Sequence, residues 1–320
     1  MNTFRRHLLA AAACFTACVS WGAAAQGAFP DRPVKIIVPF PPGGSFDVIA
    51  RGLSIKLGEL WKQPVIIENR AGAGGNIGAK VVISAPADGY TLLLWGDGVL
   101  ANPLLYAKVP FDAIRDLSGV ALLAKAPQVL VSSEKSNLTT MKDVLGAREA
   151  LNYGTAGTGS PGHLAAELMK REGAKQLNHI AYRGGGPALS DLMGNQIQLV
   201  STGLPACMGL IRSGRIKAVA VSSAKRMKIL PQVPTVGETL PGYEVDTWYG
   251  LMAPKATPVA IRNKIAADVK TVLLNSELQE RLSNEGFEVA TSTPAELEKK
   301  MINDLAFWRV QVAKSGAHSE

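Results

Sequence analysis

The chain has 320 residues, a formal net charge of +8 and three cysteines, and 47% of its residues are hydrophobic. At roughly 100–200 residues per domain, this length predicts two domains. Lysine and arginine are scattered and no basic-aromatic block occurs. This distribution argues against a nucleic-acid-binding protein and favours a mild field that attracts small anions.

The first residues have the layout of a secretory signal. Arg5 and Arg6 precede an apolar run from Leu8 to Val19, and small residues stand at Ala23 and Ala25. The apolar run is shorter than the ~20 residues that a membrane-spanning helix needs. The pattern predicts a cleavable signal peptide that ends at Ala25, and therefore export.

Removal of the signal changes the cysteine count and the charge. Taking 25 of the 320 residues away leaves 295, and the loss of two arginines lowers the charge from +8 to +6. Cys207 is then the only cysteine, so no internal disulfide is expected in spite of the oxidising destination. Cys18 offers a lipid-anchored alternative, for which its preceding residues, FTA, are a poor match.

Short apolar runs and amphipathic stretches alternate along the rest of the chain. The apolar runs predict strands over residues 34–38, 64–70, 90–95, 128–133, 151–155, 178–182, 197–202 and 216–223. The amphipathic stretches predict helices over residues 46–61, 77–84, 163–173, 187–195, 259–274 and 295–312. This alternation indicates an α/β fold with mixed, mostly parallel sheets. In such sheets ligands bind beyond the carboxyl ends of the strands.

Two extended stretches flank the middle third of the chain. They are ALLAKAPQVLVSS, residues 121–133, and YEVDTWYGLMAPKATP, residues 243–258. This arrangement predicts a middle domain inserted into an outer one, with two strands crossing between them. The predicted divisions are a signal peptide over 1–25, lobe 1 over 26–126 and 246–320, and lobe 2 over 127–245.

The loop VPFPPGGSFD, residues 38–47, joins the first strand to the first helix. Its three prolines have a fixed φ and no N–H, whereas Gly43 and Gly44 let a ligand approach the main chain. Ser45 can cap the helix, and Asp47 stands in the first turn. A helix that begins in this way leaves N–H groups free to bind an anion. The loop also fits a rigid turn in which Ser45 is an ordinary cap.

A second glycine-rich loop, GTGSPG over residues 157–162, lies between a predicted strand and helix. It fits the GxGxxG pattern, but no acidic residue ends the next strand, so a dinucleotide site is weakly supported. Ser160 stands where the lysine of a phosphate-binding P-loop belongs. What remains is another helix N-terminus, with the hydroxyls of Thr158 and Ser160 beside it. His163 is more typical of a packing or capping residue than of a catalyst.

Two further strand ends offer candidate ligand groups. In AYRGGGPALSD, Arg183 is the best candidate for direct contact with a carboxylate, although an arginine there also suits a solvated surface. In WGDGVLANP, Asp97 fits a helix cap or a ligand-binding group, and Trp95 fits packing or contact with an aromatic ligand.

Catalytic constellations are absent from the sequence. There is no GxSxG nucleophile motif, and Cys207 has no catalytic motif around it. His163 and His179 do not have a metal-ligand spacing. We therefore expect no catalytic residue, no metal and no cofactor. An NADP-dependent enzyme using GTGSPG and Arg183 is the rival interpretation, and export argues against it.

Several motifs, in order, resemble one known family. They are FPDRPVKIIVPFPPGGSFDVIAR, QPVIIENRAGAGGNIGA, PADGYTLLL, NYGTAGTGSPGHLAAEL, AYRGGGPALSDLMGNQIQLV, GRIKAVAVSSAKR and VPTVGE. Together they resemble the periplasmic solute-binding receptors of tripartite tricarboxylate transporters, also called the Bug family. The similarity covers nearly the whole mature chain.

The resemblance implies a two-lobed, type II Venus-flytrap receptor that is not an enzyme. Such a receptor captures a di-, tri- or aromatic carboxylate, mainly through main-chain groups, and delivers it to membrane subunits of a transporter. A monomer that binds no nucleic acid is expected, and a ligand sensor for a membrane kinase is the alternative use. The positions carried over to the ligand site are Phe40, Pro41, Gly43, Gly44, Ser45, Asp47, Gly96, Asp97, Thr158, Gly159, Ser160, His163, Tyr182, Arg183, Gly184, Leu204, Pro205 and Ala206.

Overall fold

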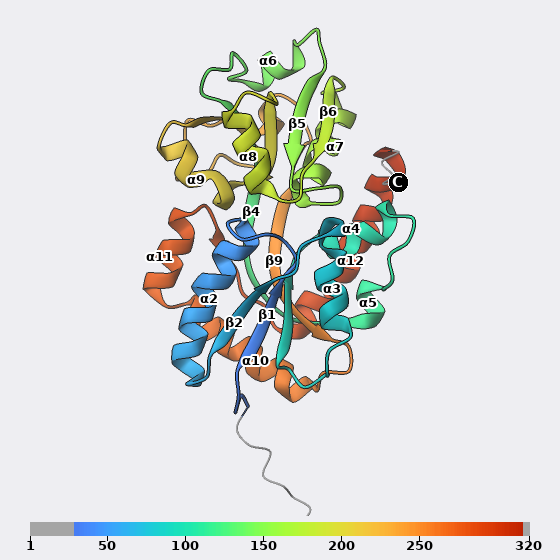
Figure 1. Ribbon diagram of the computed structural model, residues 1–320, viewed down its shortest axis with the longest axis vertical. Helices are drawn as coiled ribbons and strands as arrows, with labels where there is room; N and C mark the ends of the chain where they lie inside the picture. The colour runs from blue at the N-terminus through green and yellow to red at the C-terminus, as the bar shows by residue number, and fades with distance from the viewer. Residues whose placement is uncertain (1–28, 316–320) are drawn as a thin grey trace, which may run out of the picture. The chain divides into compact units, whose positions relative to one another are not determined.

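The computed structural model describes residues 29–315 (Figure 1). The chain divides into two units, Met1–Arg32 and Pro33–Glu320, and every element described below belongs to the second. The predicted signal peptide, residues 1–25, lies outside the described residues. None of the helices within 29–315 has the length and apolar content that a membrane span requires.

Strands and helices alternate over most of the second unit. The strands are β1 (Val34–Val38), β2 (Val65–Asn69), β3 (Thr91–Trp95), β4 (Leu117–Ser133), β5 (Leu151–Thr155), β6 (Leu177–Ala181), β7 (Leu199–Gly203), β8 (Ile216–Val221), β9 (Asp246–Pro254) and β10 (Glu288–Val289). The helices are α2 (Ser45–Trp61), α3 (Asn76–Ile83), α4 (Gly98–Leu105), α5 (Ala113–Asp116), α6 (Met141–Leu145), α7 (Pro161–Glu172), α8 (Gly185–Met193), α9 (Leu204–Arg212), α10 (Val259–Leu273), α11 (Ser276–Asn284) and α12 (Pro294–Ser315), with 3₁₀ turns η2 (Ala73–Gly75) and η3 (Val236–Glu238).

One long strand joins two groups of strands into a continuous sheet. The strand order is β2-β1-β3-β9-β4-β7-β5-β6, with β8 and β10 also paired to β4. Residues 117–127 of β4 pair antiparallel with β9, whereas its residues 128–133 pair antiparallel with β7 and β8. Pairing is parallel among β2, β1 and β3, and again among β6, β5 and β7. We call the strands on the β9 side of β4 the first half-sheet and those on its β7 side the second (Figure 1).

Helix α2 shows how the apolar pattern of the sequence builds this architecture. Ile49, Leu53 and Leu57 recur every four residues and are fully buried. That spacing places all three on one face of the helix, which packs on β1, β2 and α10. The neighbouring strand β1 is buried at four of its five positions, as expected for a strand covered on both faces.

The predicted mixed α/β class is confirmed, and most predicted elements occur within one or two residues of their expected limits. The helix expected over 46–61 spans Ser45–Trp61, and the two extended stretches form β4 and β9. The strand expected over 128–133 is the end of a longer one, because β4 continues to pair with β9 through residues 117–127. Helices α5, α6, α9 and α11 were not predicted; α9 begins after Gly203 with no side-chain cap.

Candidate functional site

A buried carboxylate holds the loop between β1 and α2 from within. Asp47 accepts hydrogen bonds from the Gly43 amide at 3.0 Å and from Asn69 Nδ2 at 3.0 Å. Its other donor is Arg51, whose Nε lies 2.8 Å away. Burial raises the pKa of Asp47, but these hydrogen bonds outweigh it and leave the pKa below the ordinary 3.8. The negative charge of Asp47 is therefore matched inside the loop by Arg51.

The same loop leaves main-chain donors free at the N-terminus of α2. Gly44, the N-cap, is extended with φ −78° and ψ 168°, and no side chain caps the helix. Within residues 29–315, the amides of Gly44, Ser45 and Phe46 donate to no acceptor. Since α2 is 17 residues long, its dipole adds partial positive charge at these amides. This helix start therefore suits an anion.

A second helix N-terminus is formed by the loop between β5 and α7. Ser160 Oγ accepts a hydrogen bond from the His163 amide at 3.4 Å. The Gly159 amide donates to His163 Nδ1 at 3.2 Å, so the imidazole fixes the loop through this hydrogen bond. The Gly162 amide has no acceptor in the described part of the chain and adds a further free donor.

Two histidines whose rings contact each other at a tilt lie under this second loop. The ring centroids of His163 and His179 are 4.2 Å apart, and Thr155 Oγ1 lies 2.7 Å from His179 Nε2. Burial lowers the pKa of His163 to about 4 and that of His179 to about 3. Both rings are therefore neutral at neutral pH, and they act here as hydrogen-bonding and packing groups.

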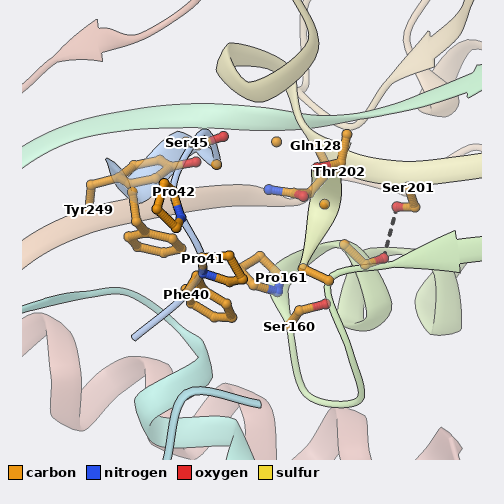
Figure 2. A pocket seen from close by; sticks show the side chains of 16 residues that line it. Phe40, Pro41, Pro42, Ser45, Gln128, Ser160, Pro161, Ser201, Thr202 and Tyr249 are labelled. Carbon is orange, nitrogen blue, oxygen red and sulfur yellow. Dashed lines mark hydrogen bonds between the residues drawn. The ribbon is translucent and has the colours of Figure 1, made fainter. Parts of the chain in front are cut away.

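The two helix N-termini open into one hollow of about 510 Å³, counting the part that is open to solvent. Figure 2 shows Tyr249, Pro42 and Ser45 on one side of it, with Ser160, Pro161 and Thr202 across from them. The full lining is Phe40, Pro41, Pro42, Gly44, Ser45, Phe46, Gln128, Ala156, Ser160, Pro161, Gly162, Gly185, Ser201, Thr202, Gly203 and Tyr249. The hollow thus lies between the two half-sheets, where β4 passes from one to the other.

Three aromatic side chains, Phe40, Phe46 and Tyr249, form what we call the aromatic wall of the hollow. The rings of Phe40 and Phe46 are stacked, with centroids 5.2 Å apart and an interplanar angle of 18°. Phe46 and Tyr249 lie 4.6 Å apart at an angle of 48°. Trp95 contacts Phe40 edge-on from behind, at 6.3 Å, and does not line the hollow. Each ring of the wall is held by its neighbours.

The polar groups of the lining are neutral. Ser45 is only 7% exposed, and its Oγ lies beside the Tyr249 hydroxyl. Gln128 Nε2 donates to Thr247 Oγ1 at 2.8 Å, and Ser201 Oγ donates to the Gly162 carbonyl at 2.8 Å. None of the lining residues carries a charge at neutral pH. A ligand anion held here would depend on main-chain N–H groups and hydroxyls.

The structure brings some of the predicted site residues together and leaves others outside the hollow. Five of the predicted positions line it, namely Phe40, Pro41, Gly44, Ser45 and Ser160. Gly43, Asp47, Gly159 and His163 shape the two loops through the hydrogen bonds described above. The remaining predicted positions, Gly96, Asp97, Thr158, Tyr182, Arg183, Gly184, Leu204, Pro205 and Ala206, are not part of the lining.

Several of these outer positions have clear structural surroundings. Asp97 is buried, and burial followed by the nearby Asp304 carboxylate raises its pKa well above 3.8. The Tyr182 hydroxyl donates to Asp191 at 2.7 Å, and Arg183 is exposed. Gly184 touches the opposite loop: a Cβ there would lie 2.7 Å from Pro41 Cγ. Glycine therefore lets the α8 N-terminus approach Pro41.

Sequence reasoning missed the residues that line the hollow from the strands and the helix starts. Gln128 and Tyr249 come from β4 and β9, and Gly185 begins α8. Pro161 and Gly162, by contrast, lie in the predicted loop 157–162. The lone polar Gln128 at the head of an apolar run is a signal that could have been used. Phe46 carries no such signal, because an aromatic residue in the first turn of a helix also suits the core.

Comparison with known proteins assigns the family. A profile of the tripartite tricarboxylate transporter family receptor matches residues 46–316. The chain belongs to this family. It is similar to Protein BugT of Bordetella pertussis, with 34% identity over 296 residues that cover 90% of this chain and 91% of BugT. The resemblance inferred from the motifs is thereby confirmed.

Two solved structures of Rhodopseudomonas palustris proteins share the fold. Rpa4515, solved with adipate, has a TM-score of 0.87 and 32% identity, covering 91% of this chain and 99% of its own. MatC, solved with bound malate, has a TM-score of 0.83 and 31% identity, covering 89% of this chain and 100% of its own. The receptor has the two-lobed fold of periplasmic binding proteins, and the periplasm is its compartment.

Proposed function

We propose that this receptor captures a small organic carboxylate between its two lobes and delivers it to the membrane subunits of a tripartite tricarboxylate-type transporter, without catalysing a reaction. The observation that carries the proposal is the pair of helix N-termini, α2 and α7, whose free amides open into one hollow without a charged side chain. The adipate and malate bound by the two R. palustris receptors support this ligand class.

The free amides are numerous enough for a useful affinity. A charge-assisted hydrogen bond contributes about 1.5–3 kcal/mol, so the amides of Gly44, Ser45, Phe46 and Gly162 together offer roughly 6–12 kcal/mol gross. A micromolar dissociation constant needs about 8 kcal/mol net, and ordering of the ligand and lobes opposes binding. Because donors come from both sides of the hollow, tight binding requires the two sides to close on the ligand.

The proposal includes the division into lobes and the route of export. Lobe 1 comprises residues 26–126 and 246–320, lobe 2 comprises residues 127–245, and the signal peptide is removed after Ala25. The change of partner along β4, from β9 at Pro127 to β7 at Gln128, supports the first boundary. The mature receptor acts as a monomer. Intact-mass measurement of the exported protein tests the cleavage site.

Titration of the purified receptor tests the proposed function. Mono-, di-, tri- and aromatic carboxylates are compared by isothermal calorimetry and by the rise in melting temperature. At least one acid is expected to bind saturably, and its methyl ester is the matched control, expected to bind at least tenfold more weakly because it lacks the anion. A panel in which no carboxylate binds, or in which the esters bind equally well, would refute the proposal.

A further inference from the structure

A third helix, α8, also begins at the hollow, which its first residue, Gly185, lines. Resting on the proposed function, we infer that the ligand of this receptor is a short dicarboxylate. Its first carboxylate is bound by the free amides at the starts of α2 and α7. Its second carboxylate is bound by the start of α8 together with the hydroxyl of Thr202, and we call this pair of donors the second anion site.

The start of α8 presents main-chain donors that lack acceptors. Its N-cap, Gly184, has φ 144° and ψ 164°, and no side chain caps the helix. Within residues 29–315, the amides of Gly185 and Gly186 donate to no acceptor, as expected for the first residues of a helix. Since α8 has nine residues, its dipole adds partial positive charge at these amides. The helix start therefore favours a negatively charged group that accepts hydrogen bonds.

A buried hydroxyl at the same place indicates a ligand. Thr202, on β7, is 7% exposed and lines the hollow, and its Oγ1 has no hydrogen-bond partner in the described part of the chain. The hydroxyl adjoins the helix start, because a Cβ on Gly185 would lie 3.2 Å from Thr202 Oγ1. Figure 2 shows Thr202 across the hollow from Tyr249. Since buried hydroxyls are normally hydrogen-bonded, this one is placed to donate to a group that enters the hollow.

The two anion sites are close enough for one short molecule to reach both. A Cβ on Gly203 would lie 2.4 Å from Ser45 Oγ, at the start of α2. The preceding residue of β7, Thr202, adjoins the start of α8, so consecutive residues of one strand contact the two helix starts. Helix α7 begins at the same place, since a Cβ on Gly162 would lie 3.3 Å from the Thr202 amide nitrogen. Consecutive Cα atoms are about 3.8 Å apart, which favours a short chain between the carboxylates.

The lining also selects the chemistry of the second group. Among the described residues that line the hollow, none is an aspartate or a glutamate, so an ammonium group would be buried without a counter-charge. An apolar end would leave the Thr202 hydroxyl and the α8 amides without acceptors, which is costly. A second carboxylate accepts from both kinds of donor and interacts favourably with the helix dipole.

The wild-type receptor tests the second anion site through matched pairs of acids. Calorimetry compares succinate with butyrate, glutarate with pentanoate, and adipate with hexanoate, so that each monoacid carries a methyl group where its diacid carries the second carboxylate. One charge-assisted hydrogen bond changes a dissociation constant by a factor of roughly 10 to 150. At least one diacid is therefore expected to bind at least tenfold more tightly than its monoacid. No variant is needed for this comparison, so folding defects cannot affect it.

Two threonine variants test the hydroxyl, each with the best diacid and its monoacid. Thr202→Val keeps the shape of the side chain but removes the donor, so the preference for the diacid should fall by a factor of roughly 10 or more. Thr257→Val is the matched control, because the Thr257 hydroxyl is also buried without a partner but does not line the hollow. It should retain the wild-type preference. An unchanged preference in Thr202→Val would overturn the role of the hydroxyl.

A pair of variants at Gly185 tests the main-chain donor. Gly185→Ala and Gly185→Pro both add a Cβ beside Thr202 Oγ1, but only proline removes the N–H. Proline suits the first position of a helix, and the ψ of 164° at Gly184 is compatible with a proline that follows it. The preference for the diacid should be lower in Gly185→Pro than in Gly185→Ala by a factor of roughly 10 or more. Equal preferences in the two variants would overturn the role of the α8 amide.

The outcomes separate this inference from the proposed function. If every monoacid binds as tightly as its diacid, the second anion site is wrong and the carboxylate receptor stands. If no acid of either kind binds, the proposed function fails together with the inference.

Discussion

Replacement of Tyr106 by phenylalanine should weaken ligand binding without weakening the fold. The Tyr106 hydroxyl donates to the Thr158 carbonyl at 2.7 Å. This bond joins the end of α4, which follows β3 of the first half-sheet, to the loop before α7, which follows β5 of the second. Gly74 packs against this hydrogen bond, since a Cβ there would lie 2.4 Å from the Thr158 oxygen and 2.7 Å from the Tyr106 hydroxyl. The two segments are therefore in close contact. We expect this hydrogen bond to form only when the lobes close.

The expected size of the effect follows from this single neutral hydrogen bond. Its net contribution is about 0.5–1.5 kcal/mol, which is a factor of roughly 2 to 13 in the equilibrium between open and closed lobes. The apparent dissociation constant should rise by the same factor, because binding draws on the closed population. Calorimetry with the best acid from the carboxylate panel measures this change, and the melting temperature of the free protein should fall by less than about 1 °C.

Tyr243→Phe is the matched control for this experiment. Its hydroxyl also donates to a main-chain carbonyl, that of Ala165 at 2.9 Å, but both residues belong to the segment proposed as lobe 2. This variant should lower the melting temperature of the free protein by about 2 °C and leave the dissociation constant unchanged. If the two variants show the same pattern, or if Tyr106→Phe binds as tightly as wild type, the reasoning about closure is refuted.

Three further changes test the loops. Gly44→Val should fold normally, because Gly44 has φ −78° and a Cβ there would meet only a carbonyl oxygen at 3.8 Å. The variant should nevertheless bind the carboxylate at least tenfold more weakly, and wild-type affinity by calorimetry would contradict this. Asp47→Asn should lower the free energy of unfolding at pH 7 by about 2 kcal/mol in urea titrations, because it weakens the charge-assisted bonds to Arg51. Since the pKa of Asp47 is lowered, that contribution is present above pH 3.8 and lost as the pH falls through the folded-state value; an equal difference between the two proteins at pH 7 and at pH 2 would argue against it. His163 and His179 have pKa values lowered from 6.5, so the unfolded chain takes up protons that the folded one does not, and stability should fall from pH 6.5 towards pH 4. His163→Gln should make the fall in melting temperature shallower, and an identical slope would count against this role.

The sequence predicts local features of the fold better than it predicts contacts between distant segments. The limits of α2 and the glycine-rich starts of α2 and α7 follow from apolar spacing and from residues with special backbone preferences. The pairing of β4 with β9 depends on partners more than a hundred residues apart, such as Ala126 and Thr247. No local pattern states which face of each strand meets the hollow.

The candidate site shows the same division. Gly44, Ser45 and Ser160 were predicted because a helix start is a local chemical feature, and they line the hollow. Phe46 and Tyr249 were missed because an apolar residue in a helix or strand is equally consistent with burial in the core. Their role emerges only when β9 places Tyr249 4.6 Å from Phe46.

The anion donors at the start of α2 are main-chain amides, and this has an evolutionary consequence. Among the standard substitutions only proline removes a main-chain N–H, so almost any point mutation there keeps the donors themselves. The wall is different, because each of its rings can be exchanged by mutation of a single codon. The product of a duplicated gene can therefore change its ligand specificity through a few side-chain substitutions. Its main-chain donors for the carboxylate remain unchanged.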